Sequence, residues 1–139
     1  MNQDLSSYPK IDYLEGPDGK RSVSFSLPWP SWTKSTRVAA AKTGGRFLSK
    51  ASKDYSNYLI QAVIVSEPPA RPWLREEYFW EFHSYTVRSD ADQHASGLLD
   101  DFVVAQLCVD DKYNFGFTVR RTRVTEKAAE RIVVNGKEV

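Results

Sequence analysis

The sequence contains a single cysteine, Cys108, among its 139 residues. One cysteine excludes an internal disulfide and any zinc site built from several cysteines, and it fits a reducing compartment. No segment approaches the roughly 18 consecutive apolar residues of a membrane span. The N-terminal stretch also lacks the apolar run of a signal peptide. We therefore expect a cytoplasmic protein that has no membrane partner.

Several catalytic signatures are absent as well. The chain has no nucleophile elbow, no phosphate-binding loop and no glycine fingerprint for dinucleotides. The sequence thus gives no support to a serine hydrolase of that type, a P-loop nucleotidase or a dinucleotide-dependent oxidoreductase.

The composition is that of a globular domain. Apolar residues make up 41% and charged residues 27% of the chain, and the length suits one core. The first 21 residues carry prolines and glycines without periodicity, so we expect an irregular N-terminal extension with room for one short strand. Residues 22–139 are expected to form a single domain.

Periodicity predicts an α+β fold, a mixed β-sheet of four to five strands packed with two main helices. One helix begins at Ser49 or Ser52 and runs to about Val65, and the other spans Ala91–Leu107. A basic loop is expected from Trp32 to a turn at Gly44–Gly45. The expected strands are Ser22–Leu27, Arg46–Leu48, Glu76–Arg88, Lys112–Thr122 and Arg131–Val134.

Charge is distributed unevenly although the net charge is only +1. Residues 89–111 carry six acidic residues and no Lys or Arg, whereas basic residues dominate the segments on either side. Carboxylates that hold metal and cations that hold phosphate would produce this pattern in a nuclease. Solvated surface charge is the alternative. The candidate DNA-binding residues are Lys34, Arg37, Lys42, Arg46, Arg88, Lys112, Arg120 and Arg121.

Two acidic pairs flank the second expected helix. Asp90-x-Asp92 lies where a strand leads into that helix, and Asp110-Asp111 lies where the helix leads into the next strand. If the two strands pair, both acidic pairs could meet at one edge of the sheet and hold Mg²⁺ or Mn²⁺ through oxygen ligands. A helix cap formed by Asp90 with Gln93, and a polar turn at Asp110-Asp111, explain the same residues without a metal.

The chain resembles the RusA family of crossover-junction endodeoxyribonucleases. The resemblance rests on Leu27-Pro28-Trp29-Pro30-Ser31, on the helix Ser49–Tyr58 and, above all, on an acidic block without insertion or deletion. That block consists of Asp90-x-Asp92, Asp100 and Asp110-Asp111. The likeness extends from about Val23 to the C-terminus.

This resemblance implies a homodimer that binds four-way DNA junctions in a bacterial or phage-infected cell and makes paired nicks with Mg²⁺. Asp90, Asp92 and Asp111 would be both the catalytic residues and the metal ligands. Asp100 would have a structural role. The chemistry would be attack of a metal-activated water on phosphorus with departure of the 3′-oxygen.

Two positions depart from the family pattern. Gln93 stands where the family has Asn, and Ser96 stands where it has a functional Lys. Lys34, Arg88 or Lys112 could supply the missing cation from elsewhere. Otherwise the protein would recognise branched DNA with impaired cleavage. A third possibility is an interaction module unrelated to DNA, in which the acidic residues only cap a helix.

Histidine and tryptophan offer weaker candidates. His94, near the start of the second helix, is a candidate general base, although an exposed helical histidine is more common. His83 is expected to pack within its strand. Trp29, Trp32 and Trp73 lie beside prolines and could stack on unpaired bases, but we expect at least two of them to serve the core.

Overall fold

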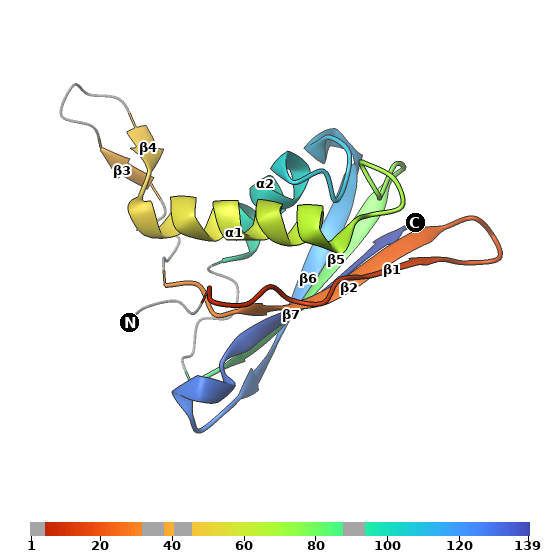
Figure 1. Ribbon diagram of the computed structural model, residues 1–139. Coiled ribbons are helices and arrows are strands. Elements are labelled where there is room, and N and C mark those ends of the chain that lie inside the picture. The colour runs from red at the N-terminus through yellow and green to blue at the C-terminus, as the bar shows by residue number, and fades with distance from the viewer. Residues whose placement is uncertain (1–4, 32–37, 41–45, 88–93) are drawn as a thin grey trace.

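The structure is a computed structural model that describes residues 5–31, 38–40, 46–87 and 94–139. A five-stranded mixed sheet carries two α-helices on one face (Figure 1). This confirms the expected α+β class. The elements are β1 (Asp12–Glu15), β2 (Arg21–Pro28), β3 (Val38–Ala40), β4 (Arg46–Leu48), α1 (Lys50–Ser66), β5 (Tyr78–Thr86), α2 (Ala95–Val104), η1 (Asp111–Tyr113), β6 (Asn114–Arg123), η2 (Lys127–Ala129) and β7 (Arg131–Glu138).

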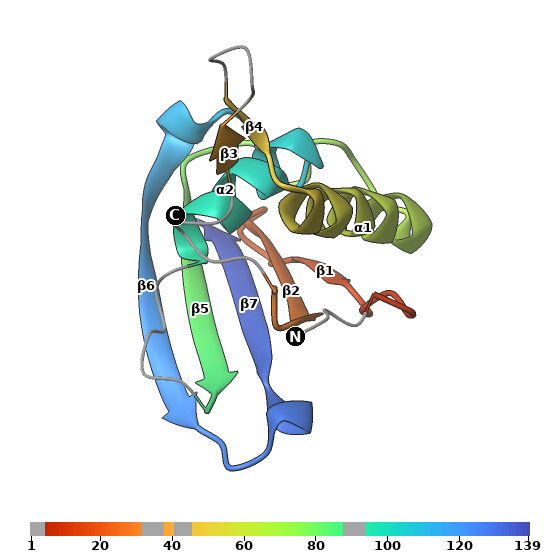
Figure 2. The same ribbon diagram turned by 90° about the vertical axis from the view of Figure 1, so that its left-hand side faces the viewer.

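The strand order in the main sheet is β1-β2-β7-β5-β6, which Figure 2 shows side by side. Neighbouring strands are antiparallel except β5 and β6, which are parallel. Parallel strands need a crossover connection, and α2 provides it. The helix that carries Asp100 is thus part of a β5-α2-β6 unit.

Alternation along β5 gives the sheet two different faces. Every second residue is buried, beginning with Tyr78, Trp80 and Phe82. The rings of Trp80 and Phe102 from α2 have centroids 4.5 Å apart, so this face contacts the helices. His83 and Tyr85 lie on the other face because successive side chains of a strand point in opposite directions.

Helix α1 forms as its sequence predicts. The hydroxyl of Ser49, the N-cap, accepts a hydrogen bond from the backbone N–H of Ser52 at 3.4 Å. The helix ends at Glu67, which has a left-handed backbone with φ of 52°, just before two prolines. Residues at helical spacing form its apolar face, and all of them are buried: Tyr55, Tyr58, Leu59, Ala62 and Val63.

Two of the three tryptophans beside prolines serve the core. Trp29 and Trp73 are 7% and 4% exposed, which confirms the expectation for these two. Trp32 lies outside the described residues. Within the described residues, no helix has both the length and the apolar content needed to span a membrane.

The N-terminal segment contains the one short strand for which the sequence left room. Strand β1 pairs with β2 and forms one edge of the main sheet. Tyr8 stacks on Tyr58 of α1 with ring centroids 5.4 Å apart, and the Tyr58 hydroxyl donates to the carbonyl of Ser7 at 2.8 Å. From residue 5 onward the described part of this segment therefore packs on the domain.

Strand β3 is an element that the sequence did not reveal. It lies within the expected basic loop and pairs with β4 as a separate two-stranded sheet, with Ala40 opposite Arg46. Its three residues, Val-Ala-Ala, have no alternation that would predict a strand. The expected turn at Gly44–Gly45 lies outside the described residues.

Candidate metal site between α2 and β6

The segment that follows α2 is fixed by backbone hydrogen bonds. Leu74 donates its N–H to the carbonyl of Leu107 at 2.9 Å, and Val109 donates to the carbonyl of Leu74 at 2.9 Å. Leu74, Leu107 and Cys108 are buried. Asp110 and Asp111 follow this largely buried, hydrogen-bonded stretch of chain and are exposed at the surface.

Asp110 caps the short helix η1. Its carboxylate accepts from the backbone N–H of Lys112 at 3.3 Å, and its carbonyl accepts from the N–H of Tyr113 at 3.0 Å. The hydroxyl of Tyr78 donates to the carbonyl of Val109 at 3.1 Å. Asp110 thus does what the polar-turn alternative predicts, which leaves Asp111 as the residue whose carboxylate is not explained by capping.

The two neighbouring carboxylates interact strongly. A hydrogen bond with the side chain of Asp110, followed by the charges of Asp110 and Asp100, raises the pKa of Asp111. The same hydrogen bond, with one from the backbone of Lys112, lowers the pKa of Asp110. Two neighbouring carboxylates repel each other when both are ionised, so the second of them loses its proton at a higher pH than an isolated aspartate would. A bound cation would relieve their repulsion.

The pKa of Tyr78, whose side chain lies beside the pair, is raised. Burial, then Cys108, then the negative charges of Asp111 and Asp110 raise the pKa of Tyr78. The Lys112 ammonium lies 5.3 Å from the centre of the Tyr113 ring. Among the described residues, this corner of the molecule is therefore locally acidic, with Lys112 at its margin.

Asp100 and Asp101 on α2 have different surroundings. Asp100 is exposed and close enough to raise the pKa of Asp111. Asp101 is buried and accepts a hydrogen bond from Ser56 of α1 at 2.7 Å. The buried link between the helices is made by Asp101, a residue that the sequence did not single out, while the resemblance pointed to Asp100.

Asp90 and Asp92 lie outside the described residues, as do the candidate DNA-binding residues Lys34, Arg37, Lys42 and Arg88. Strands β5 and β6 do pair, which was the condition for the two acidic pairs to meet, but their parallel direction separates the end of β5 from the start of β6. Tyr78 is opposite Asn114, whereas Thr86 is opposite Arg123. Asp111 therefore lies beside the start of β5, while the chain leads toward Asp90 from the end of β5. Whether the two acidic pairs meet stays a prediction.

The described residues alone form no metal cluster. Among them, no three His, Cys, Asp or Glu side chains are placed to hold a metal ion. Asp111 with Asp110 therefore offers part of a ligand set. Mg²⁺ commonly binds one or two protein carboxylates and keeps several waters. The carboxylates of Asp110 and Asp111 are ligands of that type.

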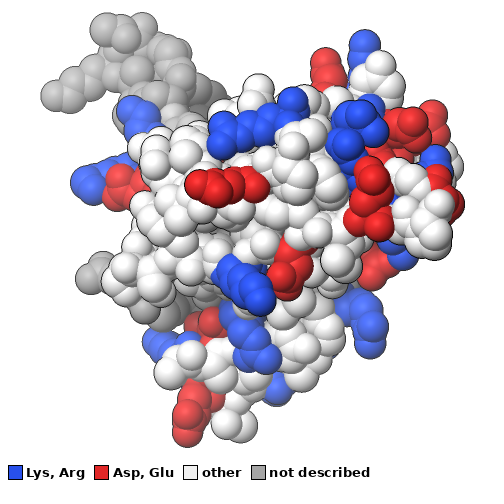
Figure 3. Space-filling view, turned by 45° about the vertical axis from the view of Figure 1, so that its right-hand side comes forward, with Lys and Arg blue, Asp and Glu red and all other residues white. Residues whose placement is uncertain are grey.

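The predicted DNA-binding residues that are described do not share one surface. Lys112 is exposed in η1 beside the acidic pair. Arg120 and Arg121 are both exposed, but they are adjacent in β6 and so point to opposite faces of the sheet. Strand β4 contains Arg46. On the face in Figure 3, Lys and Arg side chains are interspersed with Asp and Glu.

The structure overturns the expectation for His94. His94 is 1% exposed and packs edge-on against Trp29, with ring centroids 4.9 Å apart. It is neither an exposed helical residue nor accessible as a general base. His83 is only half-buried, and its Nε2 lies 2.6 Å from the hydroxyl oxygen of Thr122.

No protein-family model matches this chain, and no curated protein matches it significantly.

Proposed function

We propose that this chain is a Mg²⁺-dependent endonuclease that cuts branched DNA, with Asp90, Asp92 and Asp111 as its metal ligands. The observation that carries the proposal is the crowded carboxylate pair at the start of β6, where Asp110 raises the pKa of Asp111. The RusA-like acidic block supplies the other two ligands. That likeness also leads us to propose a homodimer, because paired nicks across a four-way junction need two sites.

A bound divalent cation would supply an activated water and positive charge at the leaving oxygen. The residues of the chain would hold and orient the substrate around it. Tyr78, through its hydrogen bond to the carbonyl of Val109, fixes the backbone that carries Asp111. Lys112, exposed next to Asp111, would contact a phosphate of the DNA backbone.

A second candidate is a protein that binds branched DNA without cutting it. Ser96 favours this candidate, because it is exposed in the first turn of α2 where the resembling family carries a lysine. A hydroxyl there cannot balance the carboxylates or bind a phosphate as a cation would.

The test uses synthetic four-way, forked and linear DNA with Mg²⁺, Mn²⁺ or EDTA. We expect metal-dependent nicking of four-way DNA that is lost in Asp92→Asn and in Asp111→Asn. The matched control is Asp12→Asn, which changes an exposed aspartate in β1 and should leave nicking intact.

The other outcomes are decisive as well. Nicking that persists in Asp111→Asn contradicts the metal-ligand assignment. Binding of four-way DNA without nicking under any metal condition supports the second candidate. If the protein neither binds nor cuts branched DNA, both candidates fail.

A further inference from the structure

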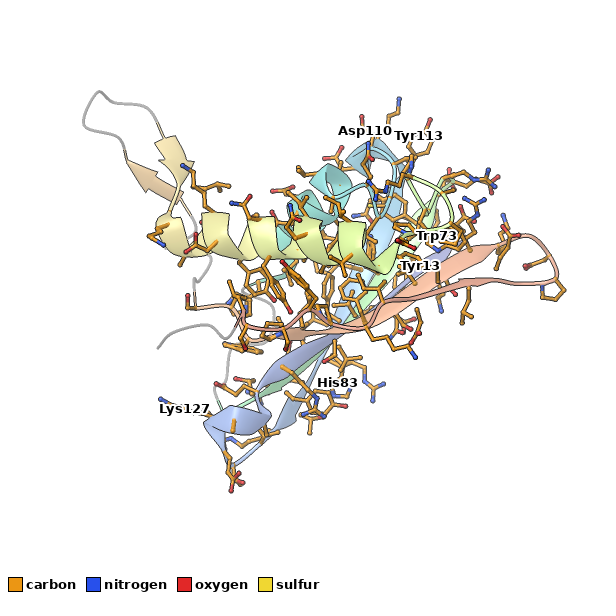
Figure 4. The ribbon with its side chains drawn as sticks, in the orientation of Figure 1. Tyr13, Trp73, His83, Asp110, Tyr113 and Lys127 are labelled. Carbon is orange, nitrogen blue, oxygen red and sulfur yellow. The ribbon has the colours of Figure 1, made fainter. Side chains whose placement is uncertain are left out.

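The sheet has a second face that the helices do not cover. Helices α1 and α2 lie on one side, and Figure 4 shows His83 on the side away from them. We use the term open face for the residues His83 and Tyr85 of β5, Arg120 and Thr122 of β6, and Arg131 of β7. Arg120, Thr122 and Arg131 are exposed, and the two rings are half-buried.

The open face contains a stacked column of three flat groups. The rings of His83 and Tyr85 are nearly parallel, with an angle of 11° and centroids 4.3 Å apart. The guanidinium of Arg131 lies 4.0 Å from the centre of the Tyr85 ring. Arg131 also donates to the carbonyl of Ala129 at 3.0 Å, so its cation is held in position before any partner arrives.

The neighbouring strands complete the surface. On β6, the hydroxyl oxygen of Thr122 lies 2.6 Å from Nε2 of His83. Burial first, and then the positive charges of Arg120 and Arg131, lower the pKa of His83. Both arginines therefore act on the same imidazole from opposite sides, because β6 and β7 flank β5.

The charge on this face is suited to an anion. Glu81, the acidic residue of β5 on the same face, is paired with Lys137 at 3.1 Å. The charges of Glu81 and Lys137 neutralise each other. The cations of Arg120 and Arg131 then lie beside His83, whose lowered pKa favours the neutral imidazole. A partner with regularly spaced negative charges would complement the two arginines.

We propose that the open face binds single-stranded nucleic acid. Arg120 and Arg131 contact phosphates, and unpaired bases lie against the His83–Tyr85 column. Proteins that bind single strands combine a basic track with aromatic side chains on which bases stack. The broad face of a sheet fits splayed bases better than a duplex, whose major groove accepts a helix or a two-stranded ribbon.

This inference does not rest on the proposed metal site. The open face lies on the side of the sheet opposite Asp110, as Figure 4 shows, and its column needs no metal ion. In a junction nuclease it would add a second contact for strands that are unpaired at a fork.

The chain offers an internal control because it has two histidines. We would follow their Hε1 proton resonances while adding a 15-nucleotide oligothymidylate in EDTA. The His83 resonance should shift and its pKa should rise, because phosphates bring negative charge to the imidazole. The resonance of His94, 1% exposed beneath Trp29, should not move. An unmoved His83 resonance at saturating oligonucleotide overturns the proposal.

Affinity measured by fluorescence anisotropy provides the second test. Tyr85→Ala should weaken binding by at least about fivefold, because the ring lies between His83 and Arg131 and its loss breaks up the column that the bases contact. Replacing both Arg120 and Arg131 by Ala should reduce the slope of log affinity against log salt by roughly 1.4, since each phosphate contact on a single strand contributes about 0.7. The matched control Lys137→Ala removes a cation already paired with Glu81 and should change affinity less than twofold.

The remaining outcomes separate the possibilities. Equal affinity for a duplex of the same length overturns the single-strand assignment, and unchanged affinity in both variants overturns the site. If the double replacement fails to fold, Arg131→Lys is the substitute: it retains the charge but loses the planar stack on Tyr85, so it should weaken binding while leaving the salt dependence unchanged. Asp111→Asn should bind the oligonucleotide normally in EDTA even if it cuts nothing, which distinguishes this site from the proposed metal centre.

Discussion

Ser56 of α1 donates its hydroxyl proton to the carboxylate of Asp101 in α2, with 2.7 Å between the two oxygens. Asp101 is only 4% exposed. The two helices that cover one face of the sheet are therefore linked by a partly buried, charge-assisted hydrogen bond. Such bonds stabilise more than neutral ones, and a buried acceptor that loses its donor is costly.

The first prediction concerns this link. Ser56→Ala should lower the free energy of unfolding by about 1–3 kcal/mol, because it leaves a buried carboxylate with one donor fewer. Urea unfolding followed by tryptophan fluorescence would measure the change. The control Asp100→Ala alters the adjacent exposed residue and should change stability by less than about 0.5 kcal/mol. Equal effects in the two variants would contradict a role for the link.

The second prediction concerns close packing at Gly136. A β-carbon there would lie 2.5 Å from Cζ3 of Trp80, a fully buried side chain. Gly136→Ala should therefore destabilise the fold by about 1–3 kcal/mol, as overpacking of a core does. Thermal unfolding would show a lower Tm, while Asn135→Ala, at the exposed neighbouring position, should leave the Tm nearly unchanged. A Gly136→Ala protein with the parental Tm would show that the indole ring moves freely.

The third prediction concerns pH and metal binding. A raised pKa means that Asp111 holds its proton at a pH where an ordinary aspartate has lost it. Mg²⁺ must displace that proton, so affinity should fall as the pH drops through the raised value. The stabilisation of the fold by MgCl₂, measured as a Tm increase, should shrink as the pH is lowered through the raised pKa of Asp111, and it should be absent in Asp111→Asn. A Tm increase that stays constant while the pH is lowered until Asp111 is protonated would contradict this account.

The shifted pKa values of Asp110 and Asp111 also predict how the stability of the metal-free protein depends on pH. Folding favours protonated Asp111, so the stability that it contributes is present at low pH and lost as the pH rises through its raised pKa. Asp110 has the opposite sign, because its lowered pKa contributes stability that is lost as the pH falls through that value. Asp111→Asn should therefore not lower the Tm at pH 7 in EDTA.

The fourth prediction concerns Cys108. Burial raises the pKa of its thiol to about 12, and the side chain is 2% exposed. Since the thiolate is the reactive species, the native protein should resist modification by a thiol-specific disulfide reagent at pH 8. One equivalent should react after denaturation in guanidinium chloride. Rapid labelling of the native protein would show that the segment between α2 and β6 opens readily.

Much of the fold could be predicted from periodicity. The alternation in β2 and the helical spacing in α1 correspond directly to buried faces. Pairing was harder, because local patterns do not specify which strands become neighbours. The parallel direction of β5 and β6 follows from the helix between them, but the position of β7 between β2 and β5 depends on contacts distant in sequence.

The candidate site was predicted less completely. The spacing of the carboxylates, together with the family resemblance, made Asp111 a candidate. Neither could show that Asp110 caps η1 or that Asp100 lies near enough to raise the pKa of Asp111. His94 has a polar side chain, so sequence alone favoured exposure. Its burial against Trp29 depends on how the end of β2 meets α2. The open face was missed because its residues come from three separate strands.

The central place of β7 has a consequence for synthesis on the ribosome. This strand follows β1, β2, β5 and β6 along the chain, yet it lies between β2 and β5 in the sheet. Before β7 is synthesised, the chain contains the β1–β2 hairpin and the β5-α2-β6 unit. The edges of β2 and β5 that later pair with β7 are then unpaired. Neither part can join the other until residues 131–138 emerge, and in that interval the exposed edges are open to chaperones or to a neighbouring nascent chain.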